Sequence, residues 1–386
     1  MQQLGPTRNR QAPWIRAAKL LLYLTLYYGG LFRLVRAMRR AAGASRACVL
    51  LYHRVNDLGD DPLTTPVRRF AEHMLVLRKF YTVLPSALLV DTLEAGQPLP
   101  NNAVAIHFDD GYRDVFTHAK PILGALNFPA AVFVSSGYVG TKRRFAHDGP
   151  FPWHFENLRP QDLREMAASG FEIGSHTVNH VDLAQSDDET VIAELMESKR
   201  DLEAIIGGSV TLFSFPFGKE ANTRPEVEAL VRKAGYRAMF SADGGYITST
   251  SNRFHLCRVG GDGDTRPLEL LMEIEGLSIG ALRRRWQERR VSRVASRLSR
   301  AQRHPNRRST HAPGMPPGDT ASVVPAKIRP EESHCLVGPL RRDDSDGPTV
   351  VDDQAAGGRG AGTGVERSLL AGGGPASPTA NREPRS

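Results

Sequence analysis

The chain has 386 residues and a net charge of +8, but its charge is unevenly distributed. Residues 1–46 hold nine Lys/Arg and no acid, and residues 281–308 hold eleven Arg and one Glu, so the rest of the chain is net acidic. An acidic body argues against nucleic-acid binding, and three widely spaced cysteines exclude a disulfide framework and a cysteine metal site.

The N-terminal segment, residues 1–46, is predicted to associate with a membrane surface. Residues 20–32 are uncharged and rich in Leu and Tyr, but a spanning helix needs about twenty apolar residues. Arginines stand on both sides of this run, and a signal peptide would carry its cleavage site closer to the apolar residues. We therefore expect an interfacial helix on anionic lipid. A short or signal-anchor span and a soluble helix covering the domain are the alternatives.

From residue 47 onward, strand patterns alternate with helix patterns. We expect strands at 47–55, 81–84, 104–108, 130–135, 210–215, 236–241 and 254–259, and one just before His176. We expect helices at 67–80, 86–93, 115–126, 160–169, 186–206 and 225–234, with Ser86 as an N-cap and Ser186 with Glu189 as a capping box. This alternation predicts a parallel sheet with helices outside it, closed or nearly closed, and an open doubly wound sheet is the alternative. Glycine-rich phosphate motifs are absent, so we expect no nucleotide.

Two adjacent carboxylates, Asp109 and Asp110, end the strand at 104–108 and precede Gly111. Strand ends in α/β folds are where catalytic groups gather. Successive side chains point in different directions, so one acid can hold a metal while its neighbour takes a proton. Taken alone, Asp-Asp-Gly is more typical of a turn.

A second cluster of polar side chains follows a later apolar run. His176 and His180 are four residues apart, which would place them on one face of a helical turn, close enough to share one ion. One carboxylate and two imidazoles with an open fourth position are typical of a catalytic metal site rather than a closed structural one.

At this point the sequence resembles a known family. His107-Phe108-Asp109-Asp110-Gly111 resembles the T-F-D-D-G motif of the polysaccharide deacetylases (NodB-homology domain, carbohydrate esterase family 4), and residues 175–180 resemble its H-[ST]-x-x-H motif. Residues 213–218, Phe-Ser-Phe-Pro-Phe-Gly, resemble its third motif, R-x-P-[YF]. The resemblance covers residues 47 to 275. It implies an irregular (β/α) barrel with about seven strands, and a metal-dependent hydrolase that removes N-acetyl groups from amino sugars of a polysaccharide or oligosaccharide.

The resemblance also implies roles for individual residues. Asp110, His176 and His180 would hold one divalent ion, Zn²⁺ in the first place, with Co, Ni or Mn as alternatives. Asp109 would stay off the metal and act as the base. The backbone N–H near Phe217, after Pro216, would contact the oxyanion.

The resemblance identifies the general acid less directly, because residues 254–259 lack the family's L-x-H motif. Leu51-Tyr52-His53 lies instead on the first strand, which is a neighbour of the last strand in a closed barrel. His53 is therefore our candidate acid, and His255 is the second candidate.

Three positions depart from the family pattern. His107 replaces a Thr, and Ser214 replaces the Arg that normally pairs with the base, so Arg258 is a candidate for that role. The family's fourth motif, an Asp with a Trp, has no clear match; Asp243 and Asp262 are candidates. Trp153 and its aromatic neighbours are candidates for stacking on sugar rings, with packing over the barrel mouth as the alternative.

The predicted domain organisation has four parts. A basic membrane-associating segment at 1–46 precedes a catalytic domain at 47–280, whose core motifs lie at 101–260. An Arg-rich helix or linker at 281–308 follows, and then a tail at 309–386 whose composition predicts disorder. The expected partners are an acetylated glycan and an anionic membrane surface, and neither nucleic acid nor nucleotide. The expected location is a membrane or the cell envelope, with the cytoplasm as an alternative. An O-deacetylase, another amide hydrolase on the same fold, and a degenerate carbohydrate-binding module are the alternative functions.

Overall fold

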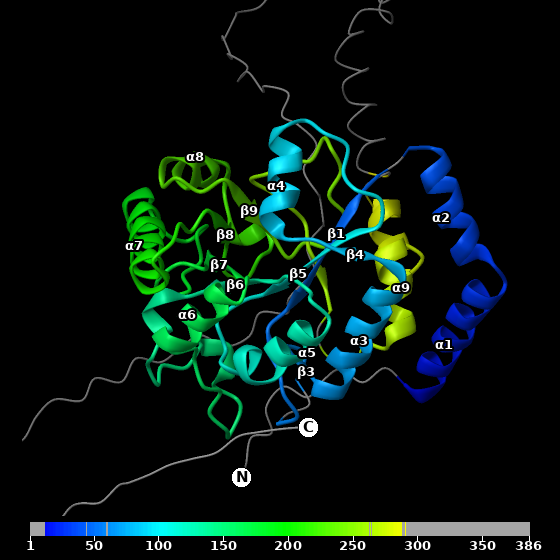
Figure 1. Cartoon of the computed structure of the whole chain (residues 1–386), viewed down its shortest axis with the longest axis horizontal. Coiled ribbons are helices and arrows are strands. Elements are labelled where there is room, and N and C mark those ends of the chain that lie inside the picture. Colours follow the sequence, from blue (N-terminus) through cyan, green and yellow to red (C-terminus); the bar gives the residue numbers. More distant parts are fainter. Residues whose placement is uncertain are drawn as a thin grey trace, which may run out of the picture. The chain divides into compact units, whose positions relative to one another are not determined.

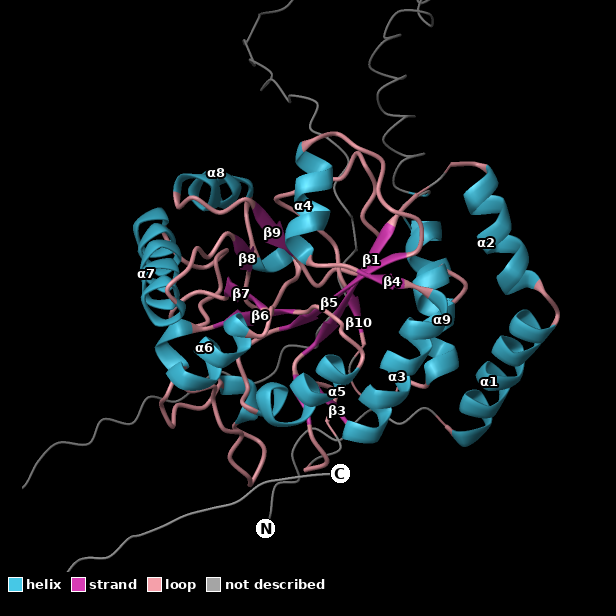
Figure 2. Ribbon diagram, in the orientation of Figure 1, coloured by secondary structure: helices cyan, strands magenta, loops and turns pink. Residues whose placement is uncertain are grey.

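The computed structural model describes residues 12–43, 45–58, 61–261, 263, 265–287 and 290. Its centre is one parallel sheet in the order β10-β1-β5-β6-β7-β8-β9, with β4 beside β5 (Figure 2). The strands are β1 (Ala47–Tyr52), β4 (Thr82–Val83), β5 (Ala103–Phe108), β6 (Ala131–Val134), β7 (Glu172–Ser175), β8 (Leu212–Ser214), β9 (Ala238–Phe240) and β10 (Val259–Gly260). A separate short pair joins β2 (Arg54–Val55) to β3 (Thr64–Thr65).

The two ends of the sheet meet through residues 253–260. Leu256 bridges to Phe240 of β9, and β10 pairs with β1, where Leu50 lies opposite Val259. The first and last strands are therefore neighbours, and the irregular (β/α) barrel that the sequence predicts is confirmed.

Helices surround this sheet (Figure 1). They are α3 (Val67–Phe80), α4 (Ser86–Glu94), α5 (Lys120–Ala125), α6 (Pro160–Ala168), α7 (Asp188–Ile206), α8 (Pro225–Lys233) and α9 (Pro267–Glu275), with short turns η1 (Val115–Ala119), η2 (Ser136–Tyr138), η3 (Ala146–Asp148) and η4 (Glu220–Asn222). Two predicted caps are wrong. Ser86 is the first helical residue of α4, after the N-cap Pro85, and Asp187 rather than Ser186 caps α7 by accepting from the Thr190 N–H.

His107 lies inside the barrel rather than at the reacting end. It is fully buried, its ring packs against Phe133 and Phe240, and its Nε2 lies 2.7 Å from Ser86 Oγ. Burial, with the charge of Arg258, lowers the pKa of His107 well below its usual value. The residue at the family's Thr position is therefore a neutral part of the core, and its bond to Ser86 explains why that hydroxyl does not cap α4.

The N-terminal segment forms two helices, α1 (Pro13–Tyr28) and α2 (Leu31–Ala41), which break at Gly29 and Gly30. Their inner sides cover the domain, because Tyr23 and Phe32 are buried with Leu271 and Met272 of α9. Within the described residues no single helix is long and apolar enough to cross a membrane, and only the α1–α2 pair, bent by 55°, meets that test together. The uncharged run at 20–32 is thus not one continuous helix.

Two predicted segments fall largely beyond these residues. Residues 279–287 are helical, but most of the predicted Arg-rich helix or linker at 281–308 and the whole tail at 309–386 lie outside the described residues.

Candidate metal centre and catalytic groups

The two aspartates lie at the carboxyl end of β5, in a tight turn. Asp110 and Gly111 have φ values of 73° and 91°. A Cβ at Gly111 would lie 2.9 Å from Val134 Cγ1, so only glycine fits there. This turn directs the side chains of Asp109 and Asp110 to different neighbours.

Asp110 lies against both predicted histidine ligands. His176 Nε2 is 3.4 Å and His180 Nε2 is 3.3 Å from Asp110 Oδ1. One potential ligand atom from each of these residues lies within 4.8 Å of the other two. The structure thus brings together the three residues that the motifs indicate.

The local conformation of the histidine motif differs from the prediction. His176 to His180 form a loop and not a helical turn, because Thr177 and His180 have φ values of 65° and 57°. The carboxylate of Glu194, on α7, accepts from the N–H groups of Val178 and Asn179 at 2.7 and 2.9 Å. The left-handed residues and this carboxylate replace the helical hydrogen bonds and still bring the two imidazoles together.

The hydrogen bonds of His176 and Asp110 fit a cation between them. His176 Nδ1–H donates to the carbonyl oxygen of Ser214 at 2.7 Å, which leaves the lone pair of Nε2 facing Asp110 Oδ1. Two acceptors at that separation repel each other unless a cation lies between them. In addition, Asp110 Oδ2 is buried and has no hydrogen-bond partner among the described residues. Two imidazole nitrogens and one carboxylate oxygen are a donor set for a divalent metal.

The charge state of Asp110 agrees with that role. Burial would raise the pKa of its carboxyl group, but the contacts with His147, His176 and His180 outweigh burial and hold this pKa well below its usual range. Asp110 is therefore an ionised carboxylate in a buried position.

His147, on η3, is a residue of the site that sequence reasoning missed. Its Nε2 lies 3.4 Å from Asp110 Oδ2 and 2.8 Å from the Tyr112 hydroxyl. Tyr112 donates to Asp148 Oδ2 at 2.8 Å, so its oxygen accepts from the Nε2–H of His147. His147 is thus a hydrogen-bond donor beside the outer oxygen of Asp110. No motif marks it, and the only sequence signal is a histidine within an aromatic loop.

Asp109 makes a different set of contacts. The Arg258 guanidinium holds both of its oxygens, Nη1 to Oδ1 and Nη2 to Oδ2, each at 2.7 Å. Ser214 Oγ donates to Oδ2 at 3.2 Å and accepts from Arg258 at 2.8 Å. Burial would raise the pKa of Asp109, but Arg258 and then His176 bring it down to about 2. Arg258 therefore supplies the ionic partner that Ser214 cannot.

The two candidate acids have different surroundings. The charge of His53, just after β1, is one of those that lower the pKa of Asp109, so His53 lies within electrostatic reach of this candidate base. His255 Nε2 lies 3.5 Å from Asp243 Oδ2. Asp262, the other candidate for the fourth motif, lies outside the described residues.

The remaining predicted residues frame the metal cluster. Phe217, after Pro216, has a φ of 62°, is 52% exposed, and presents its ring edge to His180 with centroids 4.9 Å apart. Trp153 is half-buried and stacks on Phe151 at 5.9 Å. This pair belongs to an aromatic cluster that reaches the metal ligands through Phe145, whose ring contacts His180 at 5.2 Å.

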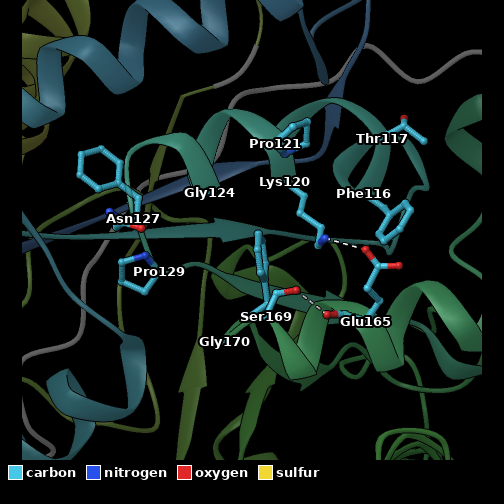
Figure 3. Close-up of a pocket in the computed structure, with 12 residues that line it drawn as sticks. Phe116, Thr117, Lys120, Pro121, Gly124, Asn127, Pro129, Glu165, Ser169 and Gly170 are labelled. Atoms are coloured by element: carbon cyan, nitrogen blue, oxygen red, sulfur yellow. Dashed lines mark hydrogen bonds and ion pairs between the residues drawn. The ribbon is translucent and has the colours of Figure 1, made fainter. Parts of the chain in front are cut away.

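A separate cavity of about 780 Å³ lies between η1, α5 and α6 (Figure 3). Lys120 crosses it to pair with Glu165 at 2.8 Å. None of its lining residues belongs to the metal cluster, so it is not part of this site.

Comparison with known proteins agrees with this geometry. Residues 96–239 match the family model described as "Polysaccharide deacetylase". The chain is 25% identical over 213 residues to YxkH of Bacillus subtilis, whose name places it among the polysaccharide deacetylases; the match covers 55% of this chain and 70% of that protein. It is 32% identical over 136 residues to the poly-beta-1,6-N-acetyl-D-glucosamine N-deacetylase of Escherichia coli K12, a match that covers 33% of this chain and 20% of that protein.

Among solved structures, the deacetylase PplD of Streptococcus pyogenes in complex with acetate superimposes with a TM-score of 0.53 and 20% sequence identity. The match covers 59% of this chain and 98% of that one. This likeness is one of fold.

Proposed function

Because residues 96–239 match the polysaccharide deacetylase family model, we propose that the chain is a metal-dependent hydrolase that removes N-acetyl groups from amino sugars of a polysaccharide or oligosaccharide. The observation that carries this proposal is that two adjacent carboxylates have different partners. Asp110 faces two histidines, while Asp109 faces an arginine. The name of the E. coli relative, an N-deacetylase, favours an acetamide over an ester as the bond that is broken.

Asp110, His176 and His180 would hold the divalent ion. Such an ion lowers the pKa of a water molecule and polarises a carbonyl group. Two nitrogens and one carboxylate oxygen suit Zn²⁺ best, with Co, Ni or Mn as alternatives.

Asp109 would accept the proton of the attacking water. The Arg258 guanidinium donates to both of its oxygens and thereby fixes the orientation of the carboxylate. A pKa of about 2 keeps it ionised at neutral pH. Asp109 is thus a base fixed in position by a charge-assisted pair.

His53 would deliver a proton to the departing amine, because it lies near Asp109 and on the neighbouring strand end. The backbone N–H near Phe217 would donate to the carbonyl oxygen as negative charge develops there. Trp153 and its neighbours would stack on the sugar rings of the chain being deacetylated.

The proposed partner is an acetylated glycan, and we propose a membrane or the cell envelope as the location. An enzyme that modifies an envelope polymer works where that polymer is made or anchored. The N-terminal segment holds nine Lys/Arg and no acid, and Arg33 and Arg40 of this set are exposed and available to an anionic surface.

Acetate release tests the reaction. The metal-loaded chain is incubated with an N-acetylated glucosamine oligomer and, separately, with an O-acetylated glycan. We expect acetate from the first substrate only, none after Asp109→Asn, and an unchanged metal content in that variant. His176→Ala should lose the metal, whereas His154→Ala, at an exposed position, should retain it. Acetate from the O-acetylated glycan alone would make the chain an O-deacetylase, and no acetate from either would refute the proposal.

A further inference from the structure

The outward side of α1 carries apolar side chains where a surface helix normally carries charges. Opposite the buried Tyr23 lie Trp14, Leu21 and Tyr28, which are 72%, 67% and 80% exposed. The two charged residues of α1, Arg16 and Lys19, lie on the side of Tyr23, and Lys19 pairs with Glu269 at 3.1 Å. The side of this helix that faces solvent therefore has no charge.

Helix α2 also carries apolar side chains on its outer side. Arg36 and Arg39 turn inward to the buried carboxylate of Glu275, with Arg36 Nη1 at 2.9 Å from Oε1. Leu34 and Met38 turn outward and are 54% and 61% exposed. A helix that pairs two of its four arginines inside and presents leucine and methionine outside is suited to an apolar environment on its outer side.

A basic cleft flanks this apolar face, between α2 and the end of α3. It has a volume of about 310 Å³ and is lined by Arg33, Arg36, Arg40 and Lys79 around the rings of Tyr27 and Phe80. Among the residues that the structure describes, none that lines this cleft is acidic. Arg33, Arg40 and Lys79 are exposed, so these three positive charges are directed to what lies outside the molecule.

We propose that the outer face of α1 and α2 docks on an anionic phospholipid membrane, with Leu21, Tyr28, Leu34 and Met38 entering the apolar boundary and the cleft binding lipid phosphate. Apolar residues next to cations are the two signals that hold a peripheral helix on such a surface. Figure 1 shows α1 and α2 side by side with α9, which covers their inner sides.

Charge argues against a second copy of this chain as the occupant. The exposed cations Arg33, Arg40 and Lys79 flank this face, so a symmetric contact through it would bring like charges together. An anionic lipid surface complements both the apolar side chains and the cleft.

Vesicle flotation of the full-length chain tests this docking, with phosphatidylcholine vesicles that contain either no anionic lipid or one third phosphatidylglycerol. We expect binding to the anionic vesicles, weakened by high salt because the phosphate contacts are screened. The charge variant Arg33→Glu/Arg40→Glu should weaken this binding by about tenfold or more. The apolar variant Leu21→Glu/Leu34→Glu should do the same.

Matched controls stand on the opposite part of the domain. Met196→Glu, at an equally exposed apolar position (55%) of α7, and Arg164→Glu, at an exposed position of α6, should bind as the wild type does. All variants should keep the wild-type melting temperature, because none of the changed side chains is buried. Vesicle binding needs no turnover, so this test is independent of the proposed deacetylation.

Four outcomes would overturn the docking surface. The first two are equal binding to both vesicle types and wild-type binding by the apolar or the charge variant. Retention of the chain on vesicles in high salt would indicate a bilayer-spanning segment. A dimer that forms without vesicles and that the apolar variant abolishes would indicate a second copy of the chain on this face.

Discussion

The Arg258 guanidinium donates a hydrogen bond to each carboxylate oxygen of Asp109, although 149 positions separate the two residues. Both side chains are buried, so neither has water as an alternative partner. This pair keeps a carboxylate ionised beside the metal cluster and fixes the direction in which it points.

Replacing Arg258 should change both stability and the pH profile. In Arg258→Met the buried carboxylate loses its partner, which costs about 3–5 kcal/mol of unfolding free energy. The pKa of Asp109 should rise, because burial then acts with less opposing charge, and the acid limb of kcat/KM should move to higher pH. Arg258→Lys restores the charge but not the fork, so it should move the limb less. An acid limb at the wild-type pH in Arg258→Met would show that Asp109 is not the base.

The general acid should be His53 rather than His255. His53→Ala should lower kcat by about 10²-fold or more and remove the alkaline limb of the pH profile, as loss of a proton donor does. His255→Ala should keep kcat within a few-fold, because its Nε2 faces Asp243 Oδ2 at 3.5 Å. Both variants should keep the metal. The reverse pattern would make His255 the acid.

His147 should support the metal without binding it. Its Nε2 donates to Tyr112 and lies 3.4 Å from Asp110 Oδ2, where it helps to hold the pKa of that carboxyl low. Loss of such support for a metal ligand costs about 10–100-fold in metal affinity. We expect His147→Phe to lower Zn²⁺ affinity by about tenfold in a chelator competition, and His147→Gln, which retains an N–H, to lower it less. His154→Phe, at an exposed position of the same loop, is the control. Complete metal loss in His147→Phe, as in His176→Ala, would make His147 a ligand.

His73 should make the fold sensitive to acid. It is buried between the Tyr52 hydroxyl and the Thr265 carbonyl, and burial lowers its pKa from 6.5 to about 4. Between those pH values the unfolded chain binds the proton and the folded chain does not, so stability falls as the pH drops through this window. The loss amounts to at most about 3 kcal/mol.

Denaturant unfolding of wild type and His73→Gln at pH 7 and pH 4.5 checks this effect. Gln is not titratable, so the variant should lose less stability between the two pH values. Asp114 acts in the opposite direction, because burial raises its pKa to about 6, but it is present in both proteins and cancels in the difference. An identical loss in both proteins would show that His73 is already protonated or exposed.

The sequence alone was enough to find Asp109, Asp110, His176 and His180. Each stands at or just after a strand whose pattern is local, and motif spacing places them at one edge of a parallel sheet. Strand–helix alternation left an open sheet as an alternative, and it was the family resemblance that implied a barrel in which the first and last strands are neighbours, as β1 and β10 are. The shape of the histidine loop was not predictable, because the bonds from Glu194 and the left-handed residues leave no periodic signal.

Only the tertiary structure showed which charged or polar side chains contact these residues. Arg258 was one candidate from the sequence, and its contact with Asp109 became certain only when the barrel closed. His147 approaches Asp110 from a loop without a motif, and Arg36 reaches Glu275 across 239 positions. Such contacts form between side chains that are remote in sequence, and helix and strand periods report only neighbours a few residues apart. Local patterns therefore determined the candidate ligands and the strands. The packing of distant elements determined the partner of Asp109, the contact of His147 with Asp110 and the face that α1 and α2 leave to solvent.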